Sequence, residues 1–223
     1  MNIADNYRKI LEKIPEGVKL IAITKTKTPE EIMEVYECGH RHFGESKAQE
    51  MVPKKEELPD DIRWHMVGHL QSNKVKYIAP FVSLIHSVDS LKLLKVINKE
   101  GRKSQRVIPC LLQLHIADET SKFGMSFEET CELLESEAYK AMEHIKVHGL
   151  MGMATFTEYE EKVAGEFRQL KNHFQEIKKK YFAEDEAFRE ISMGMSDDYQ
   201  IGIKEGSTMV RVGSAIFGER QYT

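Results

Sequence analysis

Val107-Ile-Pro-Cys-Leu-Leu-Gln-Leu-His115 is the longest apolar run of the chain, and it decides the fold class. The residues that follow, Ser126-Phe-Glu-Glu129, form a capping box, which predicts a helix with apolar residues at steps of three and four as far as Ala138. A second apolar run, Ile145-Lys-Val-His-Gly-Leu-Met151, comes next. A buried strand, a helix and another strand in this order are typical of an α/β protein with a parallel sheet.

The same unit recurs on both sides of this stretch. The predicted strands cover residues 18–24, 41–44, 64–67, 84–86, 107–115, 145–151, a seventh beginning at 188–192, and 209–212. Eight strands alternating with helices in about 200 residues predict a single (β/α)8 barrel. The alternative, an open doubly wound sheet, usually has a glycine fingerprint at its first turn, and Thr24-Lys-Thr-Lys-Thr-Pro29 contains no glycine. We therefore predict one α/β barrel domain over residues 1–223, with an N-terminal helix in residues 1–16.

The composition excludes several classes of protein. The chain has 223 residues and a formal net charge of −4, with 41% hydrophobic and 30% charged residues. This is enough apolar material for a large core, and the scattered basic residues give no footprint for nucleic acid or an anionic membrane. No window approaches the roughly 20 apolar residues of a membrane span, and the N-terminus lacks the apolar stretch of a signal peptide. We predict a cytoplasmic protein.

The cysteines and histidines do not predict a disulfide framework or a metal site. Cys38, Cys110 and Cys131 are widely spaced and lack a C-x-x-C pair, so they are expected to be reduced residues of the core. The spacings His40-x-His42 and His65-x3-His69 could each supply two ligands, but no third ligand of fitting geometry is apparent. We predict no metal.

Small-residue loops follow the last two predicted strands. They are Ser192-Met-Gly-Met-Ser196 and Gly213-Ser-Ala-Ile-Phe-Gly218. Phosphate often binds at these two loops of a barrel, because glycine lets backbone amides approach an anion and serine adds a hydroxyl donor. Glycine and serine are also ordinary turn residues, but their occurrence in both loops favours a phosphate site.

Lys25 and Arg211 are the candidate cations. Lys25 follows the apolar end of the first strand, where a desolvated amine can act as a nucleophile toward aldehydes; alternatively, Lys25 and Lys27 are two solvated lysines. Arg211 and Gly213 share a face of the last strand, which points the arginine into the barrel. A lysine, an anion site and a second cation fit pyridoxal 5′-phosphate (PLP), although a Schiff-base aldolase or another phosphosugar enzyme fits them too.

Seven motifs spread over essentially the whole chain resemble the YggS/PROSC family of pyridoxal phosphate homeostasis proteins. They are Ile23-Thr-Lys-Thr-Lys27, Phe43-Gly-Glu45, Trp64-His-Met-Val-Gly-His-Leu-Gln-Ser-Asn-Lys74, Lys122-Phe-Gly124, His148-Gly-Leu-Met151, Ser192-Met-Gly-Met-Ser-Asp-Asp198 and Gly206-Ser-Thr-Met-Val-Arg-Val-Gly-Ser-Ala-Ile-Phe-Gly218. The resemblance implies a fold-type III PLP barrel, similar to the N-terminal domain of alanine racemase. Thr24 and Ser46 depart from the serine and asparagine of many members, and both remain polar.

The resemblance also implies roles for individual residues. Lys25 matches the lysine that forms the PLP aldimine, and Arg211 matches the arginine that faces the pyridine nitrogen. The phosphate-binding positions are matched by Ser192, Ser196, Gly213 and Ser214. His69 and Asn73 belong to the third-loop motif and are candidate pocket residues.

The function implied is PLP homeostasis without firm enzymatic activity. An arginine at the pyridine nitrogen weakens the electron sink that an aspartate would strengthen, which argues against transaminase-like chemistry. The chain has no length for the second domain that completes racemases of this fold, so we expect a monomeric carrier whose partners are PLP and client enzymes that need it. The alternatives are an amino-acid racemase of weak or narrow activity and a class I aldolase that uses Lys25.

Overall fold

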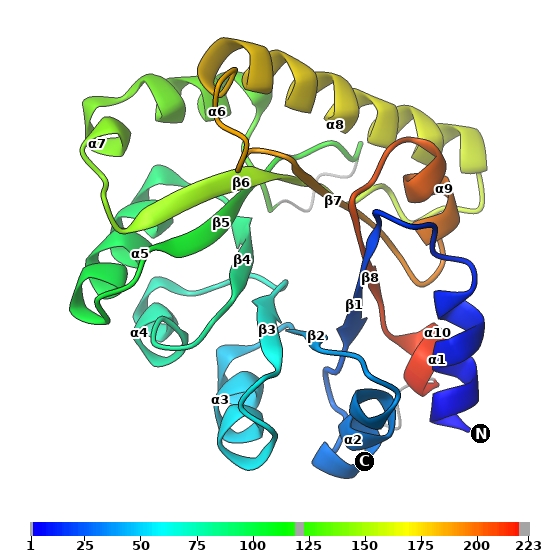
Figure 1. The fold of residues 1–223 in the computed structure, drawn as a ribbon. Helices are drawn as coiled ribbons and strands as arrows, with labels where there is room; N and C mark the ends of the chain where they lie inside the picture. The colour runs from blue at the N-terminus through cyan, green and yellow to red at the C-terminus, as the bar shows by residue number, and fades with distance from the viewer. Residues whose placement is uncertain (1, 119–122, 219–223) are drawn as a thin grey trace.

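A closed barrel of eight parallel strands forms the centre of the molecule (Figure 1). The computed structural model describes residues 2–118 and 123–218. The strands are β1 (Lys19–Ile23), β2 (His42–Glu45), β3 (Arg63–Met66), β4 (Leu84–Val88), β5 (Ile108–Gln113), β6 (Ile145–Met151), β7 (Glu190–Met195) and β8 (Met209–Val212). Each strand pairs with the next along the chain, and β8 pairs with β1 to close the ring. The predicted barrel and its eight strands are confirmed.

Helices surround this ring, as Figure 1 shows. They are α1 (Ile3–Leu11), α2 (Pro29–Glu37), α3 (Ala48–Glu57), the 3₁₀ turn η1 (Ser72–Lys74), α4 (Val75–Ile78), α5 (Leu91–Lys103), α6 (Phe127–Glu135), α7 (Glu137–Lys140), α8 (Glu160–Tyr181), α9 (Tyr199–Lys204) and α10 (Ser214–Phe217). The capping boxes predicted at Thr28 and Ser126 are present. Among the described residues, no helix combines the length and apolar character needed to cross a membrane.

Several predicted boundaries differ from the structure by a few residues, and two of them have a clear local cause. The helix expected to run to Ala138 ends at Glu135, because Ser136 adopts an extended backbone conformation and its hydroxyl caps the next helix, α7. The fifth strand ends at Gln113 rather than His115: the Leu114 amide donates a last hydrogen bond to the Met151 carbonyl of β6, and Leu114 then forms an isolated bridge with Met125. Both differences arise from local hydrogen bonds that override the apolar pattern.

Successive residues of each strand point to opposite sides of the barrel wall, so their side chains pack in two separate regions. Outward-facing residues such as Phe43, Trp64 and Ile85 are fully buried in one large apolar cluster beneath the helices. Inside the barrel, Leu84, Leu111, Met151 and Met209 form a separate small apolar cluster. Two of the free cysteines contribute to the outer region: Cys110 is buried there, and Cys38 is half-buried against the same cluster, whereas Cys131 is half-buried and is not part of it.

Candidate functional site

A cavity of about 450 Å³ brings together the two ends of the chain and the middle of the sequence. Its walls come from the loops after β1 and β3, from the end of β5, and from the loops after β7 and β8. These loops meet because the carboxyl ends of all parallel strands lie at one end of a barrel. The volume is within the range of roughly 300–1,000 Å³ that small-molecule sites occupy.

Five of the six predicted site residues line this cavity. They are Lys25, Ser196, Arg211, Gly213 and Ser214. Ser192 does not line the cavity: it is completely buried on β7, and its hydroxyl is engaged by Arg211 and His86. The structure therefore places Ser192 beneath the cavity, where it contacts Arg211 rather than the space that a ligand would fill.

The loop that carries Lys25 is held from both sides. The hydroxyl of the preceding Thr24 donates to the Glu45 carboxylate at 2.6 Å, and Lys54 Nζ donates to the Thr24 carbonyl at 2.8 Å and to Glu45 at 2.6 Å. Thr26, on the other side, has a φ of 64°, a conformation that is rare for a threonine, and its amide donates to Glu50. These contacts fix the backbone that presents Lys25 to the cavity.

Lys27, the second lysine of the motif, connects the β1 loop to neighbouring helices. Although it also lines the cavity, its Nζ donates to the Phe217 carbonyl at 3.0 Å and lies 3.3 Å from Glu31. It thereby connects the β1 loop to α10, the short helix that follows β8. Lys27 therefore has a structural partner on each side.

The loops after β7 and β8 form one connected wall. The Gly213 amide donates to Ser196 Oγ at 3.1 Å, and the Met195 amide donates to the Asp198 carboxylate at 2.5 Å. Gly194 has a φ of +94°, and a Cβ there would lie 2.8 Å from the Tyr199 backbone, so this turn requires glycine. Serine hydroxyls and backbone amides at such a turn form a site that suits an anion.

Arg211 places a buried positive charge at the cavity. It is 4% exposed, and its Nη1 and Nη2 donate to Ser192 Oγ at 2.6 Å and to the Gly152 carbonyl at 3.1 Å. Burial lowers the pKa of Arg211 to about 10, while the nearby Asp198 carboxylate opposes that change. The guanidinium therefore remains charged at neutral pH and acts only as a hydrogen-bond donor.

Several lining residues were not predicted from the sequence. Gln113, Phe123, Met153 and Asp197 all line the cavity. Alternation on β5 could have indicated Gln113, because it shares the inward face with Leu111. The other three come from loops, for which the sequence carries no periodic signal.

The candidates of the third-loop motif separate in the structure. His69 and Ser46 line the cavity, whereas Asn73 does not. The His69 ring lies 4.7 Å from the Phe123 ring, and its Nδ1 is 3.2 Å from an Asp89 carboxylate oxygen. Lys122 of the neighbouring motif lies outside the described residues.

The histidine spacings considered for a metal serve another purpose. His65 forms hydrogen bonds with His42 and His86 at 3.0 and 2.9 Å between ring nitrogens. Two nitrogens on a tetrahedral zinc would be about 3.4 Å apart, given Zn–N bonds of about 2.0–2.1 Å. In the described parts of the chain, no group of three or more His, Cys, Asp or Glu residues is arranged to hold a metal ion.

Comparison with known proteins finds relatives along the whole chain. The family model for the alanine racemase N-terminal domain matches residues 1–221. A pyridoxal phosphate homeostasis protein of Aquifex aeolicus is 37% identical over 233 aligned residues, with all of both chains covered. Another from Escherichia coli K12 is 34% identical and covers 100% of this chain and 98% of its own.

Solved structures agree with these sequence relatives. PipY of Synechococcus elongatus without PLP has a TM-score of 0.90 and 31% identity, and covers 97% of this chain and 100% of its own. The same protein with PLP bound has a TM-score of 0.85, 30% identity and the same coverage. Alanine racemase from Bartonella henselae, at 14% identity and a TM-score of 0.71, covers 99% of this chain and 61% of its own and shares the fold. The chain therefore belongs to the YggS/PROSC family of pyridoxal phosphate homeostasis proteins, within the broader alanine racemase N-terminal domain family.

Proposed function

We propose that this protein binds pyridoxal 5′-phosphate in the 450 Å³ cavity and takes part in PLP homeostasis as a carrier. The observation that supports the proposal most directly is the convergence of Lys25, Arg211 and the linked Ser196–Gly213 wall on one space. An aldehyde, a ring nitrogen and a phosphate are the three polar parts of PLP. Each has a partner of suitable chemistry around this cavity.

The cavity residues divide the recognition of PLP among them. Ser196, Gly213 and Ser214 would hold the phosphate: the two hydroxyls are donors suited to an anion, and the Gly213 amide, which donates to Ser196 Oγ, would orient that hydroxyl. Arg211 would donate to the ring nitrogen from the buried side of the cavity. When bound, PLP would supply an aldehyde, and Lys25 would supply the amine that holds it reversibly. Ser192 acts on the ligand only through Arg211.

Arg211 also argues against transaminase-like chemistry. A permanently charged guanidinium at the ring nitrogen discourages protonation of that nitrogen, so the bound ring is a weak electron sink. Reversible condensation with Lys25 then allows uptake and release of PLP without further chemistry. Under this proposal, the protein is a cytoplasmic monomer that exchanges PLP with enzymes that depend on it.

The test compares the wild type with two lysine variants. Purified protein loaded with PLP is expected to show a visible imine band, and borohydride reduction should attach the cofactor permanently at Lys25. Lys25→Ala should lose both the band and the attachment, whereas Lys27→Ala should retain a reducible attachment because Lys27 bonds to Glu31 and Phe217. An imine band that persists in Lys25→Ala would refute the assignment of this lysine.

Turnover distinguishes the carrier from the racemase alternative. The wild type loaded with PLP is incubated with single enantiomers of amino acids, and the appearance of the other enantiomer is followed by chiral chromatography. We expect no turnover at rates of order 1 per second or more, which are typical of enzymes. Such a rate would refute the carrier proposal while leaving PLP binding intact.

A further inference from the structure

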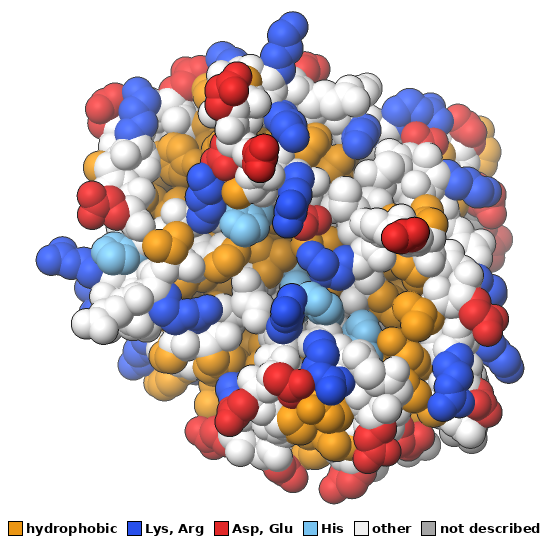
Figure 2. All heavy atoms as spheres, viewed as in Figure 1, with side chains coloured by type: hydrophobic (Ala, Val, Ile, Leu, Met, Phe, Trp, Pro, Cys, Tyr) orange, Lys and Arg blue, Asp and Glu red, His pale blue; other side chains and the backbone are white. Residues whose placement is uncertain are grey.

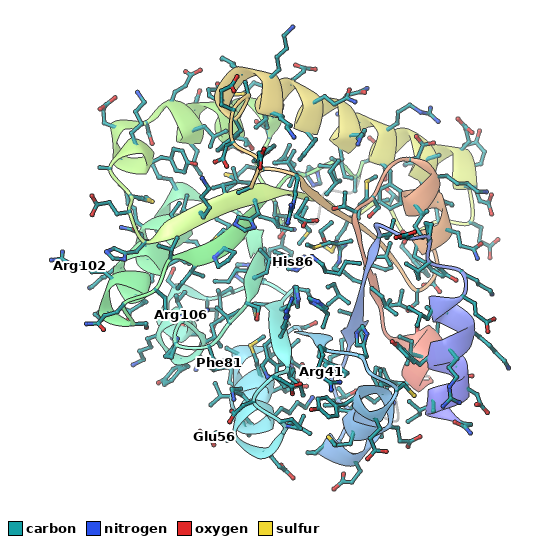
Figure 3. All side chains as sticks on the ribbon, viewed as in Figure 1. Arg41, Glu56, Phe81, His86, Arg102 and Arg106 are labelled. Atoms are coloured by element: carbon teal, nitrogen blue, oxygen red, sulfur yellow. The ribbon has the colours of Figure 1, made fainter. Side chains whose placement is uncertain are left out.

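Three histidines form a hydrogen-bonded row inside the barrel, which we name the histidine ladder: His42, His65 and His86. His42 Nδ1 lies 3.0 Å from His65 Nε2, and His65 Nδ1 lies 2.9 Å from His86 Nε2. His86 Nδ1 lies 2.8 Å from Ser192 Oγ, which accepts from Arg211. Figure 3 labels His86 inside the ring of strands. Through Ser192, the ladder therefore ends at Arg211, the buried cation that lines the cavity.

The register of the barrel places each ladder histidine two residues farther along its strand than the histidine on the preceding strand. Gly44 of β2 pairs with His65 of β3, so His65 lies two residues farther along its strand than His42. Met66 pairs with Ile85, which by the same count places His86 two residues beyond His65. Positions two residues apart share a face, so all three rings point into the barrel. The ladder therefore rises from the start of β2 toward the cavity.

The hydrogen bonds determine which ring nitrogens carry protons. Arg211 can only donate, and Ser192 Oγ accepts from it, so the hydroxyl proton is directed to its other bonded partner, His86 Nδ1. A neutral His86 must then carry its proton on Nε2 and donate to His65 Nδ1. By the same argument, His65 donates from Nε2 to His42 Nδ1. All three rings are therefore in the Nε2–H form.

Burial and the surrounding charges keep the ladder neutral. His65 and His86 are 3% and 0% exposed, and burial lowers the pKa of both well below 6.5. Burial lowers the pKa of His42, which is half-buried, to about 4.

Cations close to the ladder also lower the pKa of its histidines. They are Lys19 of β1, which approaches Glu190 of β7 at 3.5 Å, together with Arg63 beside His42 and Arg211 beside His86. Figure 2 shows basic side chains and histidines gathered around a hollow near the middle of the viewed face. A proton added to the ladder would be repelled from both ends.

We propose that the ladder and Ser192 are positioning residues that hold Arg211 in place for the ring nitrogen of PLP. This inference rests on the proposed function. An oriented row of imidazoles presents acceptor atoms toward Arg211 and compensates a buried charge whose direct partners are the neutral Ser192 and Gly152. The row does not conduct protons to the ligand, because the guanidinium at its end does not give up a proton.

The first test needs no cofactor. Long-range ¹H–¹⁵N NMR spectra of the apo protein at neutral pH distinguish the two neutral forms of histidine. We expect His42, His65 and His86 to be neutral Nε2–H forms, and His86 to lose this single form in Ser192→Ala. An Nδ1–H form, or a protonated ring, at His65 or His86 in the wild type would overturn the proposal.

The second test cuts the ladder in the middle. His65→Leu removes both ring contacts. We expect PLP to dissociate about tenfold faster from this variant, which is roughly the effect of losing one buried hydrogen bond. The absorbance maximum of the bound cofactor should also shift. His65→Asn can place its amide oxygen near the position of Nδ1 and accept from His86, so it should restore most of the wild-type rate and spectrum.

His40→Leu is the matched control. His40 is also buried and hydrogen-bonded, to Tyr7 at 3.3 Å and to the His42 carbonyl at 2.7 Å, but its ring does not join the ladder. We expect it to change stability without changing the PLP spectrum. Identical dissociation rates and spectra for His65→Leu and wild type would overturn the ladder proposal. Failure of the wild type to bind PLP would instead overturn the proposed function, and the NMR test would still decide the protonation pattern.

Discussion

Neighbouring residues on the same strands face two different interiors. Trp64 packs outward into the apolar layer under the helices, while His65, the next residue, points into the barrel and bonds to two other histidines. The same contrast separates Ile85 from His86 on β4. The outer layer is apolar and stabilises the fold, whereas the barrel interior also contains a polar row that contacts Arg211. The two regions should therefore respond differently to substitution and to pH.

The largest effect is expected in the outer layer. Phe188 is completely buried and stacks between Phe174 and Phe182, with ring centroids 4.9 and 4.2 Å away. Phe188→Ala should lower the free energy of unfolding by about 3–5 kcal/mol, because it removes a large apolar side chain and leaves a cavity. Urea unfolding measures this loss. The PLP affinity of the folded fraction should stay unchanged, and a parallel loss of affinity would mean that the two regions are coupled.

An intermediate effect is expected from acid acting on the barrel interior. Unfolded histidines titrate near pH 6.5, whereas burial lowers the pKa of His42 to about 4 and holds the pKa of His65 and His86 well below 6.5. Below pH 6.5, the unfolded chain binds protons that the folded chain does not, so stability falls as pH falls toward about 4.5. Each such histidine contributes up to about 1.4 kcal/mol per pH unit, and above pH 7 the contribution is constant.

Variants test whether the buried histidines cause this pH dependence of the stability. Urea unfolding between pH 7 and 4.5 should give a slope smaller by about one proton for His65→Leu, with His40→Leu as a second variant because burial also lowers the pKa of His40 to about 4. Phe188→Ala should lower the whole curve and keep the wild-type slope. Equal slopes in all three variants and the wild type would show that other groups cause the acid sensitivity.

The smallest effect is expected in the apolar cluster inside the barrel. Met209 is 2% exposed and packs with Leu84, Leu111 and Met151. Met209→Leu conserves most of the volume, so it should change the free energy of unfolding by less than about 1.5 kcal/mol and leave the PLP spectrum unchanged. A spectral shift in this variant would show that the apolar cluster inside the barrel also positions the PLP site, contrary to the assignment of that role to the polar residues.

Much of the barrel and part of the site could be predicted from the sequence. The alternation of apolar runs with capped helices predicted all eight strands, because strand and helix periodicity depend on nearby residues. Lys25, Arg211 and the last two loops could be predicted because a barrel places strand ends together. Ser192, predicted to bind phosphate, is buried and does not line the cavity, because alternation on a strand indicates a face but not how far along the barrel the position lies.

The histidine ladder shows most clearly what the sequence by itself could not determine. The spacings His40-x-His42 and His65-x3-His69 relate residues of one segment only, so by themselves they suggest no more than pairs of metal ligands. The row instead joins β2, β3, β4 and β7, and it exists because each strand pairs with the next at a particular offset. Local periodicity determined which elements form and which faces are buried. Closure of the barrel, which sets the register between distant segments, decided which buried polar groups meet and where their protons reside.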